Sequence, residues 1–206
     1  TLRHTLFPYT TLFRSAIWIY SNVNTSIDNC TFSNNQSNAT GGPNPGGGAI
    51  YALGSGSSSR IEIKNSTFFS NKNKRDDLRN GGAIYVSNLS NFIINSCYFS
   101  ENGLDECAYN GGAVYIDQSP TLINSSMFSE NSAQLKGGAL YINESPVEII
   151  RTTVNGNLST DGGGLYNVAY SNTLSRLNCT LAGNTAEVDN SGGNQGGGIY
   201  HEGFEG

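Results

Sequence analysis

The chain has few charges and no long apolar run. Of its 206 residues 13% are charged, against roughly 25% in a usual soluble protein, and the formal net charge is −5. The eleven Lys and Arg residues form no cluster, so the basic patch that nucleic-acid or anionic-membrane binding requires is missing. No apolar segment approaches the ~20 residues of a membrane-spanning helix. We therefore expect no nucleic-acid partner and no membrane span in this fragment.

The composition also disfavours long helices. Glycine contributes 26 residues, which is well above the usual share of ~7%, and Asn and Ser fill most of the remaining polar positions. Because these three residue types are poor helix formers, the sequence predicts strands and turns.

Residues 1–15 differ from the rest of the chain. The segment from His4 to Ser15 resembles a translated sequencing adapter, and no secretory signal is recognisable. An ordinary N-terminal strand is the alternative interpretation. We expect residues 1–15 to be an artefact outside the repeat, and residues 16–206 to form a single fragment that is truncated at both ends.

Two short motifs alternate through the chain about every 30 residues, a period that indicates a repeat architecture. The first is Gly-Gly-(Ala/Gly)-apolar-aromatic, whose aromatic residues are Trp18, in a truncated first copy, and Tyr51, Tyr85, Tyr115, Tyr141, Tyr166 and Tyr200. The second is an apolar residue, usually Phe, followed three positions later by Asn35, Asn71, Asn102, Asn131, Asn157 and Asn184.

Apolar residues alternate within each repeat, as in Ile84 and Val86 or Ile61 and Ile63. Alternation with period two indicates strands, and no repeat contains a convincing helical stripe. Strands without crossover helices must stack on the equivalent strands of the next repeat, ~4.8 Å away. The sequence therefore predicts an all-β fold, a parallel β-helix (solenoid) of about six to seven coils with no helical domain.

Repeated Gly-Gly-Ala-(Ile/Leu/Val) alternating with Phe-x-x-Asn resembles the repeats of the polymorphic outer-membrane proteins. The resemblance covers Ala16 to Tyr200. The last two coils depart from it, because Val154 and Leu181 replace Phe, while Gly164 and Gly198 replace Ala. The resemblance implies a right-handed β-helix, the passenger of an autotransporter-like adhesin of the chlamydial type, at the cell surface or secreted.

Stacked coils place equivalent residues in ladders along the axis. We expect the asparagine column to be a structural ladder, because an Asn at a bend can bond its own turn and stacked amides can bond one another. The phenylalanine column should fill the core. The glycine pairs should supply positive φ or close backbone approach at a corner.

The aromatic column that begins at Trp18 is the candidate ligand-binding site. Tyr85 lies between the inward-facing Ile84 and Val86, so alternation turns it and its equivalents outward. An exposed aromatic stripe can stack on sugar rings or anchor a protein partner. The alternative is a self-stabilising cross-strand ladder that loops partly cover. We expect a glycan or a host-surface protein as partner, and exposed coil ends also allow end-to-end association.

Repeat length varies mainly between the asparagine and the next glycine pair. The longer segments there are residues 36–46, 72–80, 103–110 and 185–195. They should project together along one side, where solenoids commonly bind. Tolerated drift in insertion length is the alternative.

No catalytic constellation is recognisable in the repeats. Glu62 and Glu148 share a column three coils apart, and Glu101 and Glu130 lie on adjacent coils, where we weigh a solvated turn against a weak calcium contact. The only two histidines are His4 and His201, outside the repeat and near the end of the chain. The sequence predicts no catalytic residue, no metal site and no cofactor. The alternative is a fragment of a carbohydrate-active β-helix enzyme, a polysaccharide lyase or glycoside hydrolase, whose catalytic coils are missing.

The cysteines do not predict a disulfide framework. Cys30, Cys97 and Cys179 share a column of small residues with Ser66 and its equivalents. No two of them lie on adjacent coils, so their Cα atoms should be further apart than the ~7 Å limit for a bridge. Cys107 lies in an insertion and has no predictable partner.

Overall fold

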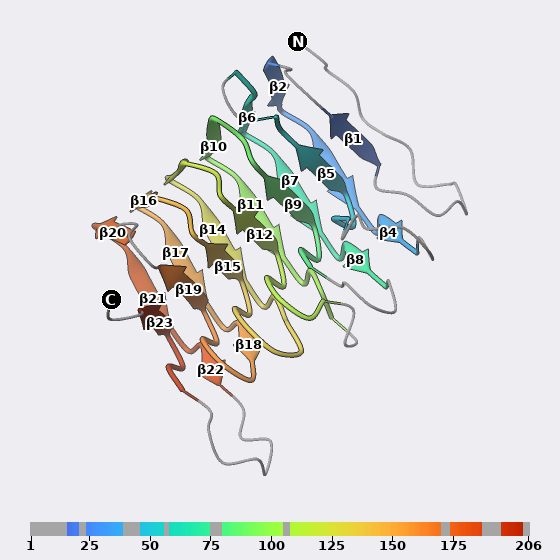
Figure 1. Cartoon of the computed structure of the whole chain (residues 1–206). Helices are drawn as coiled ribbons and strands as arrows, with labels where there is room; N and C mark the ends of the chain where they lie inside the picture. Colours follow the sequence, from blue (N-terminus) through green and yellow to red (C-terminus); the bar gives the residue numbers. More distant parts are fainter. Residues whose placement is uncertain are drawn as a thin grey trace.

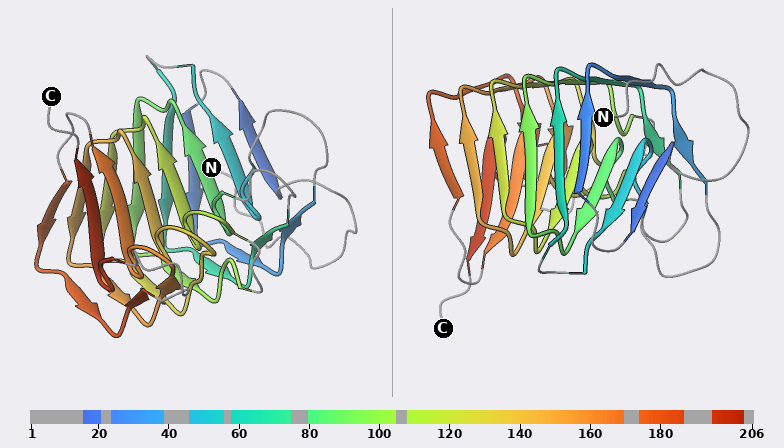
Figure 2. Two further views of the ribbon diagram at one scale, coloured as in Figure 1. Left: turned by 60° about the horizontal axis from the view of Figure 1, so that its bottom comes forward. Right: turned by 90° about the horizontal axis from the view of Figure 1, so that it is seen from above.

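The computed structural model describes residues 16–20, 24–38, 46–55, 58–74, 80–104, 108–169, 174–186 and 195–203. Within these ranges all regular secondary structure is β-strand. The chain winds as a coil whose turns contribute strands to three long sheets (Figures 1 and 2). Equivalent strands of successive coils pair in parallel, which confirms the predicted all-β parallel β-helix.

The tyrosine sheet, which carries the aromatic column, has the strand order β1-β5-β9-β12-β15-β19-β23. Its strands are β1 (Ile17–Tyr20), β5 (Ile50–Leu53), β9 (Ile84–Ser87), β12 (Val114–Asp117), β15 (Leu140–Asn143), β19 (Leu165–Ala169) and β23 (Ile199–Gly203). The register pairs Tyr51 with Tyr85 and Tyr115 with Tyr141, so each aromatic residue meets its equivalent in the next coil.

The isoleucine sheet follows the tyrosine sheet along the chain. Its strands are β2 (Asn24–Asp28), β6 (Arg60–Lys64), β10 (Asn91–Asn95), β13 (Thr121–Asn124), β16 (Val147–Ile150) and β20 (Leu174–Leu177). Ile27, Ile63, Ile94, Ile123 and Ile149 occupy one buried column of this sheet.

The phenylalanine sheet completes each coil. Its strands are β3 (Thr31–Ser33), β7 (Thr67–Phe69), β11 (Tyr98–Ser100), β14 (Met127–Ser129), β17 (Thr153–Asn155) and β21 (Thr180–Ala182). Two short pairs join β4 (Gln36–Ser37) to β8 (Lys72–Asn73) and β18 (Leu158–Ser159) to β22 (Thr185–Ala186).

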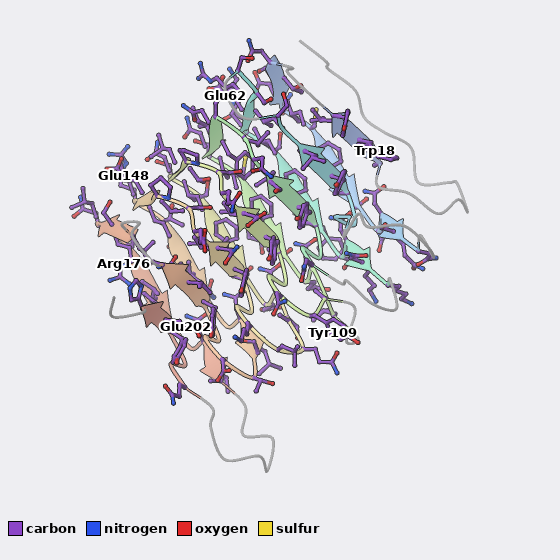
Figure 3. The ribbon with its side chains drawn as sticks, viewed as in Figure 1. Trp18, Glu62, Tyr109, Glu148, Arg176 and Glu202 are labelled. Carbon is purple, nitrogen blue, oxygen red and sulfur yellow. The ribbon has the colours of Figure 1, made fainter. Side chains whose placement is uncertain are left out.

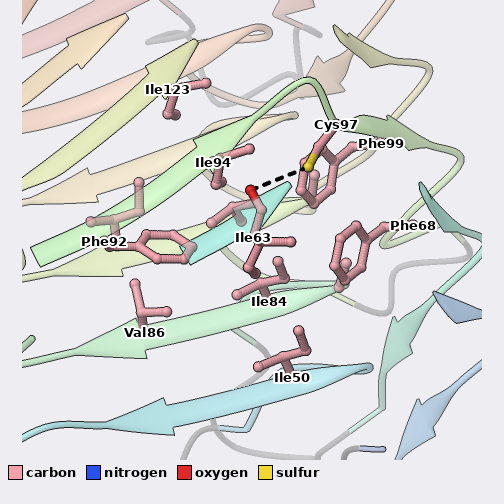
Figure 4. Close-up of a cluster of buried hydrophobic side chains, with 14 of the residues drawn as sticks. Ile50, Ile63, Phe68, Ile84, Val86, Phe92, Ile94, Cys97, Phe99 and Ile123 are labelled. Carbon is pink, nitrogen blue, oxygen red and sulfur yellow. Dashed lines mark hydrogen bonds between the residues drawn. The ribbon is translucent and has the colours of Figure 1, made fainter. Parts of the chain in front are cut away.

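The core lies between the three sheets and is filled by ladders of like side chains. Phe68, Phe99 and Phe128 are fully buried, as predicted, and successive rings stack with their centroids 4.6 Å apart. Isoleucines from the other two sheets, among them Ile63 and Ile84, pack against these rings (Figure 4). Burial of large apolar side chains in every coil supplies the main driving force for the stacking.

Each sharp bend between the isoleucine and phenylalanine sheets is made by one residue with positive φ. These residues, with φ between 46° and 54°, are Asn29, Asn65, Ser96, Ser125, Arg151 and Asn178. Asn tolerates the left-handed conformation better than most residues, because its short polar side chain can bond locally. Asn29, Asn65 and Asn178 therefore have a local backbone cause at these corners.

The glycine pairs serve both purposes that the sequence predicted. Gly111 has a φ of 66°, a conformation that L side chains rarely adopt. The next residue, Gly112, stacks so closely on the following coil that an added Cβ would lie 2.0 Å from the carbonyl oxygen of Gly138. No side chain fits at that position without moving a backbone strand.

Several predictions fall on parts of the chain outside the described ranges. These parts include residues 1–15, Cys107 and the central residues of the four longer segments, so the expectations about the artefact and the projecting loops stay predictions. Among the described residues, no helix is long and apolar enough to cross a membrane.

Candidate functional site

The aromatic column forms a continuous stack along the tyrosine sheet. Ring centroids of neighbours from Tyr51 to Tyr166 lie 4.7–5.5 Å apart, and their planes differ by only 10–13°. Trp18 meets Tyr51 edge-on at 5.7 Å, and Tyr200 continues the column beyond Tyr166 at 4.8 Å. The side chains lie outside the hydrophobic core, as the alternation predicted, because Ile84 and Val86 on either side of Tyr85 belong to that core.

The expected exposure of this stripe is wrong for much of its length. Tyr51, Tyr85 and Tyr166 are buried, and only Trp18, at 48%, is exposed. The reason is that each ring covers the face of its neighbour, so an inner ring offers little more than its edge. A sugar ring cannot reach the faces of these tyrosines without unstacking them, so a ligand-binding role for the column finds no support in the geometry.

One end of the aromatic column carries a charged cluster. The hydroxyl of Tyr166 donates to the Glu202 carboxylate, and Nζ of Lys136 lies 3.8 Å from the same carboxylate and 4.4 Å from the centroid of the Tyr166 ring. Burial and the neighbouring carboxylate raise the pKa of Tyr166 far above its ordinary value. The hydroxyl therefore stays protonated and acts as a donor. The sequence alone did not predict this cluster, because its members come from three different coils.

The asparagine column forms a continuous hydrogen-bonded ladder. Oδ1 of Asn131 accepts from both the backbone N–H and the side-chain Nδ2 of Asn102, at 3.0 and 2.9 Å. The same double contact joins Asn35 to Asn71, Asn71 to Asn102, Asn131 to Asn157, and Asn157 to Asn184. Each Nδ2 from Asn71 onward also donates to the carbonyl of the apolar column residue in the preceding coil, as Asn102 does to Phe68 at 3.0 Å.

The column of cysteine, serine and threonine residues also forms hydrogen bonds from coil to coil. Sγ of Cys97 donates to the carbonyl oxygens of Asn95, at 3.3 Å, and Ile63, at 3.5 Å (Figure 4). Ser126 in the next coil makes the equivalent bond to Asn124 at 2.8 Å and accepts from the backbone N–H of Cys97. Cys30, Cys97 and Cys179 form no disulfide bond with one another.

The sequence missed a further ladder at the corner between the tyrosine and isoleucine sheets. Oγ of Ser119 accepts from the backbone N–H of Leu89, and Oγ of Ser145 accepts from that of Ser119, both at 3.0 Å. All three residues are buried. The recurring signal is a serine two positions after Asp117 and after Asn143, to whose carbonyl groups the two hydroxyls donate.

The carboxylates lie where the repeat placed them. Glu62 and Glu148 occupy one outward column of the isoleucine sheet with Ile93 and Leu122 between them (Figure 3). Glu101 and Glu130 sit at positive-φ bends of adjacent coils. Among the described residues, no group of three or more His, Cys, Asp or Glu side chains is arranged to hold a metal ion.

His201 takes an inward position near the C-terminal end of the described coils. It pairs with Asn167 in a column that Ile142 and Ile116 occupy in earlier coils, and its Nδ1 lies 2.8 Å from Nδ2 of Asn167. Arg176 likewise continues the column of Ile149. Polar side chains therefore replace the apolar ladder in these last coils, a change that the periodic pattern did not predict.

An exposed patch lies on the outer face of the phenylalanine sheet. Phe69, Tyr98 and Met127, on three consecutive coils, are 37%, 40% and 37% exposed. Tyr98 pairs directly with Met127. Phe69 lies in the strand on the other side, two positions after Thr67, the partner of Tyr98. Alternation with the buried Phe68, Phe99 and Phe128 fixes all three side chains outward. We call Phe69, Tyr98 and Met127 the apolar patch.

Within the phenylalanine sheet the neighbours of the apolar patch are uncharged, while Glu101 and Glu130 lie at the bends directly after Ser100 and Ser129. The outward columns of the sheet continue in Thr31, Thr67, Thr153, Thr180, Ser33, Ser100, Ser129, Asn155 and Ala182. None of these residues carries a charge. The hydroxyl groups of Tyr98 and Ser129 lie 3.1 Å apart, which fixes the Tyr98 ring against the face.

Comparison with known proteins identifies the fold family. Residues 13–203 match the family model described as a right handed beta helix region. Searches among curated proteins and among solved structures gave no significant match. Since the family match spans nearly all of the chain, and the structure has the matching parallel coils, the chain belongs to the right-handed β-helix family.

Proposed function

We propose that this β-helix is a surface-displayed or secreted binding rod, a passenger segment of an adhesin. Its partner is a glycan or a protein on a host surface. The observation that carries the proposal is the apolar patch, because exposed apolar surface with a polar rim is characteristic of interaction sites. The resemblance of the repeats to those of polymorphic outer-membrane proteins also favours this role.

The ladders make the rod suited to presenting such a patch. Asparagine, phenylalanine and tyrosine side chains bond or stack from coil to coil, so neighbouring coils hold the patch residues in a fixed register. Side chains on a rigid scaffold lose less entropy on binding than side chains on a mobile loop. The apolar patch therefore offers a preformed surface.

The chemistry of the face favours a neutral partner surface. The rings of Phe69 and Tyr98 can stack on an apolar sugar face or pack against apolar side chains. Hydroxyl groups of the surrounding threonines can exchange hydrogen bonds with the partner. An acidic partner would find no opposite charge in the outward columns of this sheet.

Binding and turnover can be measured on the same samples. The chain is applied to arrays of neutral and acidic glycans and to intact epithelial cells, and each soluble glycan is also tested for new reducing ends, with and without calcium. The proposal expects saturable binding without product. Release of new reducing ends would contradict it and favour a fragment of a carbohydrate-active enzyme, and absence of binding to every surface would also contradict it.

A further inference from the structure

We propose that the aromatic column of the tyrosine sheet conducts an oxidising equivalent, an electron hole, from Trp18 to Tyr166. This activity is independent of the proposed binding role, which uses another face. The ladder is continuous between these two residues, with centroid separations of 5.7, 5.4, 5.0, 4.7 and 5.5 Å. Because electronic coupling between rings falls steeply with distance, short steps between nearly parallel rings favour transfer from ring to ring.

The chemistry of the residues distinguishes this column from the phenylalanine column. Phe68, Phe99 and Phe128 stack at 4.6 Å, so good packing does not require a hydroxyl group. A phenol or an indole gives up an electron far more readily than a phenyl ring does. Packing alone therefore does not explain why this column consists of tyrosines, which can be oxidised.

Trp18 is the entry point. It is the single tryptophan of the chain, it is 48% exposed, and its ring contacts Tyr51 edge-on. A one-electron oxidant in solvent can remove an electron from it directly. The buried Tyr51 and Tyr85 are shielded from the same oxidant, so the hole reaches them only through the column.

The electron hole should stop at Tyr166, because the hydroxyl group of this residue has a proton acceptor. A phenol becomes a strong acid on oxidation, and the Tyr166 hydroxyl already donates to the Glu202 carboxylate. The Lys136 ammonium group, 4.4 Å from the ring centroid, disfavours a cationic radical there. One electron therefore leaves the Tyr166 ring for the oxidised column while the hydroxyl proton moves to Glu202, and a neutral tyrosyl radical remains beside a protonated carboxyl group. The external oxidant gains the one electron that Tyr166 loses.

The transfer can be followed by flash photolysis of the whole chain, with photogenerated tris(bipyridine)ruthenium(III) as the oxidant. The tryptophan radical should form first and should then be replaced by a tyrosyl radical, since the two have distinct absorption spectra. In Tyr166→Phe this tyrosyl signal should be lost, which assigns the radical to the buried Tyr166. Trp18→Phe should abolish the first signal.

Tyr115→Phe tests the path without removing a ring from the stack. Phenylalanine stacks at similar spacing in the column of Phe68 and Phe99, so we expect an unchanged circular dichroism spectrum and melt. The tryptophan radical should persist in this variant, and the tyrosyl signal should be lost. Tyr98→Phe, which removes an exposed tyrosine outside the column, is the matched control and should change neither result. Glu202→Gln should reduce the tyrosyl signal while leaving the tryptophan radical intact.

Two outcomes would overturn the inference. One is a tryptophan radical that decays in Tyr115→Phe as fast as in the unchanged chain, with the same tyrosyl signal. The other is a tyrosyl signal that is unchanged in Tyr166→Phe, since direct oxidation of tyrosines outside the column, such as Tyr20 or Tyr98, would then account for the radical.

Discussion

Asn102 and Asn131 share one oxygen atom as the acceptor of two hydrogen bonds. Oδ1 of Asn131 lies 3.0 Å from the backbone N and 2.9 Å from Nδ2 of Asn102. Both residues are fully buried, so no solvent satisfies these groups when the contact is lost. The pair is one step of a ladder that runs from Asn35 to Asn184, and it makes the stability of each of these coils depend on its neighbours.

Asn102→Ala should destabilise the protein strongly. The substitution removes the acceptor of the Asn71 backbone N–H and the donor to the Phe68 carbonyl, and leaves both groups buried. Each unpaired group costs about 1–3 kcal/mol of unfolding free energy. Urea unfolding measures the loss, with Asn91→Ala at an exposed strand position as the control. An unfolding curve like that of the unchanged chain would contradict this prediction, because water would then already bond the polar groups of the ladder.

The glycine pairs offer a contrast between two substitutions of the same kind. Gly112→Ala places a Cβ 2.0 Å from the Gly138 carbonyl oxygen, so we expect severe destabilisation or failure to fold. Gly198→Ala restores the alanine of the earlier repeats at a position where nothing lies within 4 Å of the new Cβ. It should be neutral, or stabilising by about 0.4–1 kcal/mol through the lower entropy of the unfolded chain. Thermal melts compare the two, and equal effects would contradict the close approach at Gly112.

The buried thiol of Cys97 should make stability depend on alkaline pH. Burial raises the pKa of Cys97 from 9.0 to about 11. The unfolded chain therefore releases this proton at lower pH than the folded protein does. The stabilising contribution is complete below pH 9 and is lost as the pH rises to about 11.

Cys97→Ser isolates this contribution. Serine occupies the same column at Ser66 and Ser126, so the variant should fold. Between pH 9 and 11 the unchanged chain should lose about 2 kcal/mol more unfolding free energy than the variant does. Urea unfolding measures this free energy at each pH. If it changed with pH in the same way for both proteins, the pKa of Cys97 would be the same in the folded and unfolded states, and the prediction would be wrong.

The sequence predicted the sheets and the register because the repeat constrains them together. Phe68 and Tyr85 face opposite ways, as the period-two alternation requires, and the glycine pairs sit at the corner where backbones approach. Periodicity carries no information on positions that break it. Asn167 and Arg176 thus take apolar column positions without any signal in the repeat.

The candidate site was harder to predict than the fold. Alternation gives the direction of Tyr51 but not the coverage of its ring, which depends on the stacked neighbours. The apolar patch was not predicted from the sequence because its residues break the repeat. Phe69, Tyr98 and Met127 stand in columns whose other members are small or hydroxyl-bearing residues or Asn, so they do not recur in every repeat and no motif marks them.

Binding by a variant of the apolar patch tests the proposed function most directly. The triple variant Phe69→Ser, Tyr98→Thr and Met127→Thr gives each position a residue that its own column already holds in other coils, so the fold should persist. The matched control is Leu135→Ser with Leu177→Ser, which removes two exposed leucines from other surfaces. With the glycan or cell surface that binds the unchanged chain, the triple variant should lose roughly 1–3 kcal/mol of binding free energy for each ring that stacks, on the scale of base–aromatic stacking. The control should bind normally. An unchanged Kd in the triple variant, with an intact circular dichroism spectrum, would contradict the assignment of the binding surface to this face.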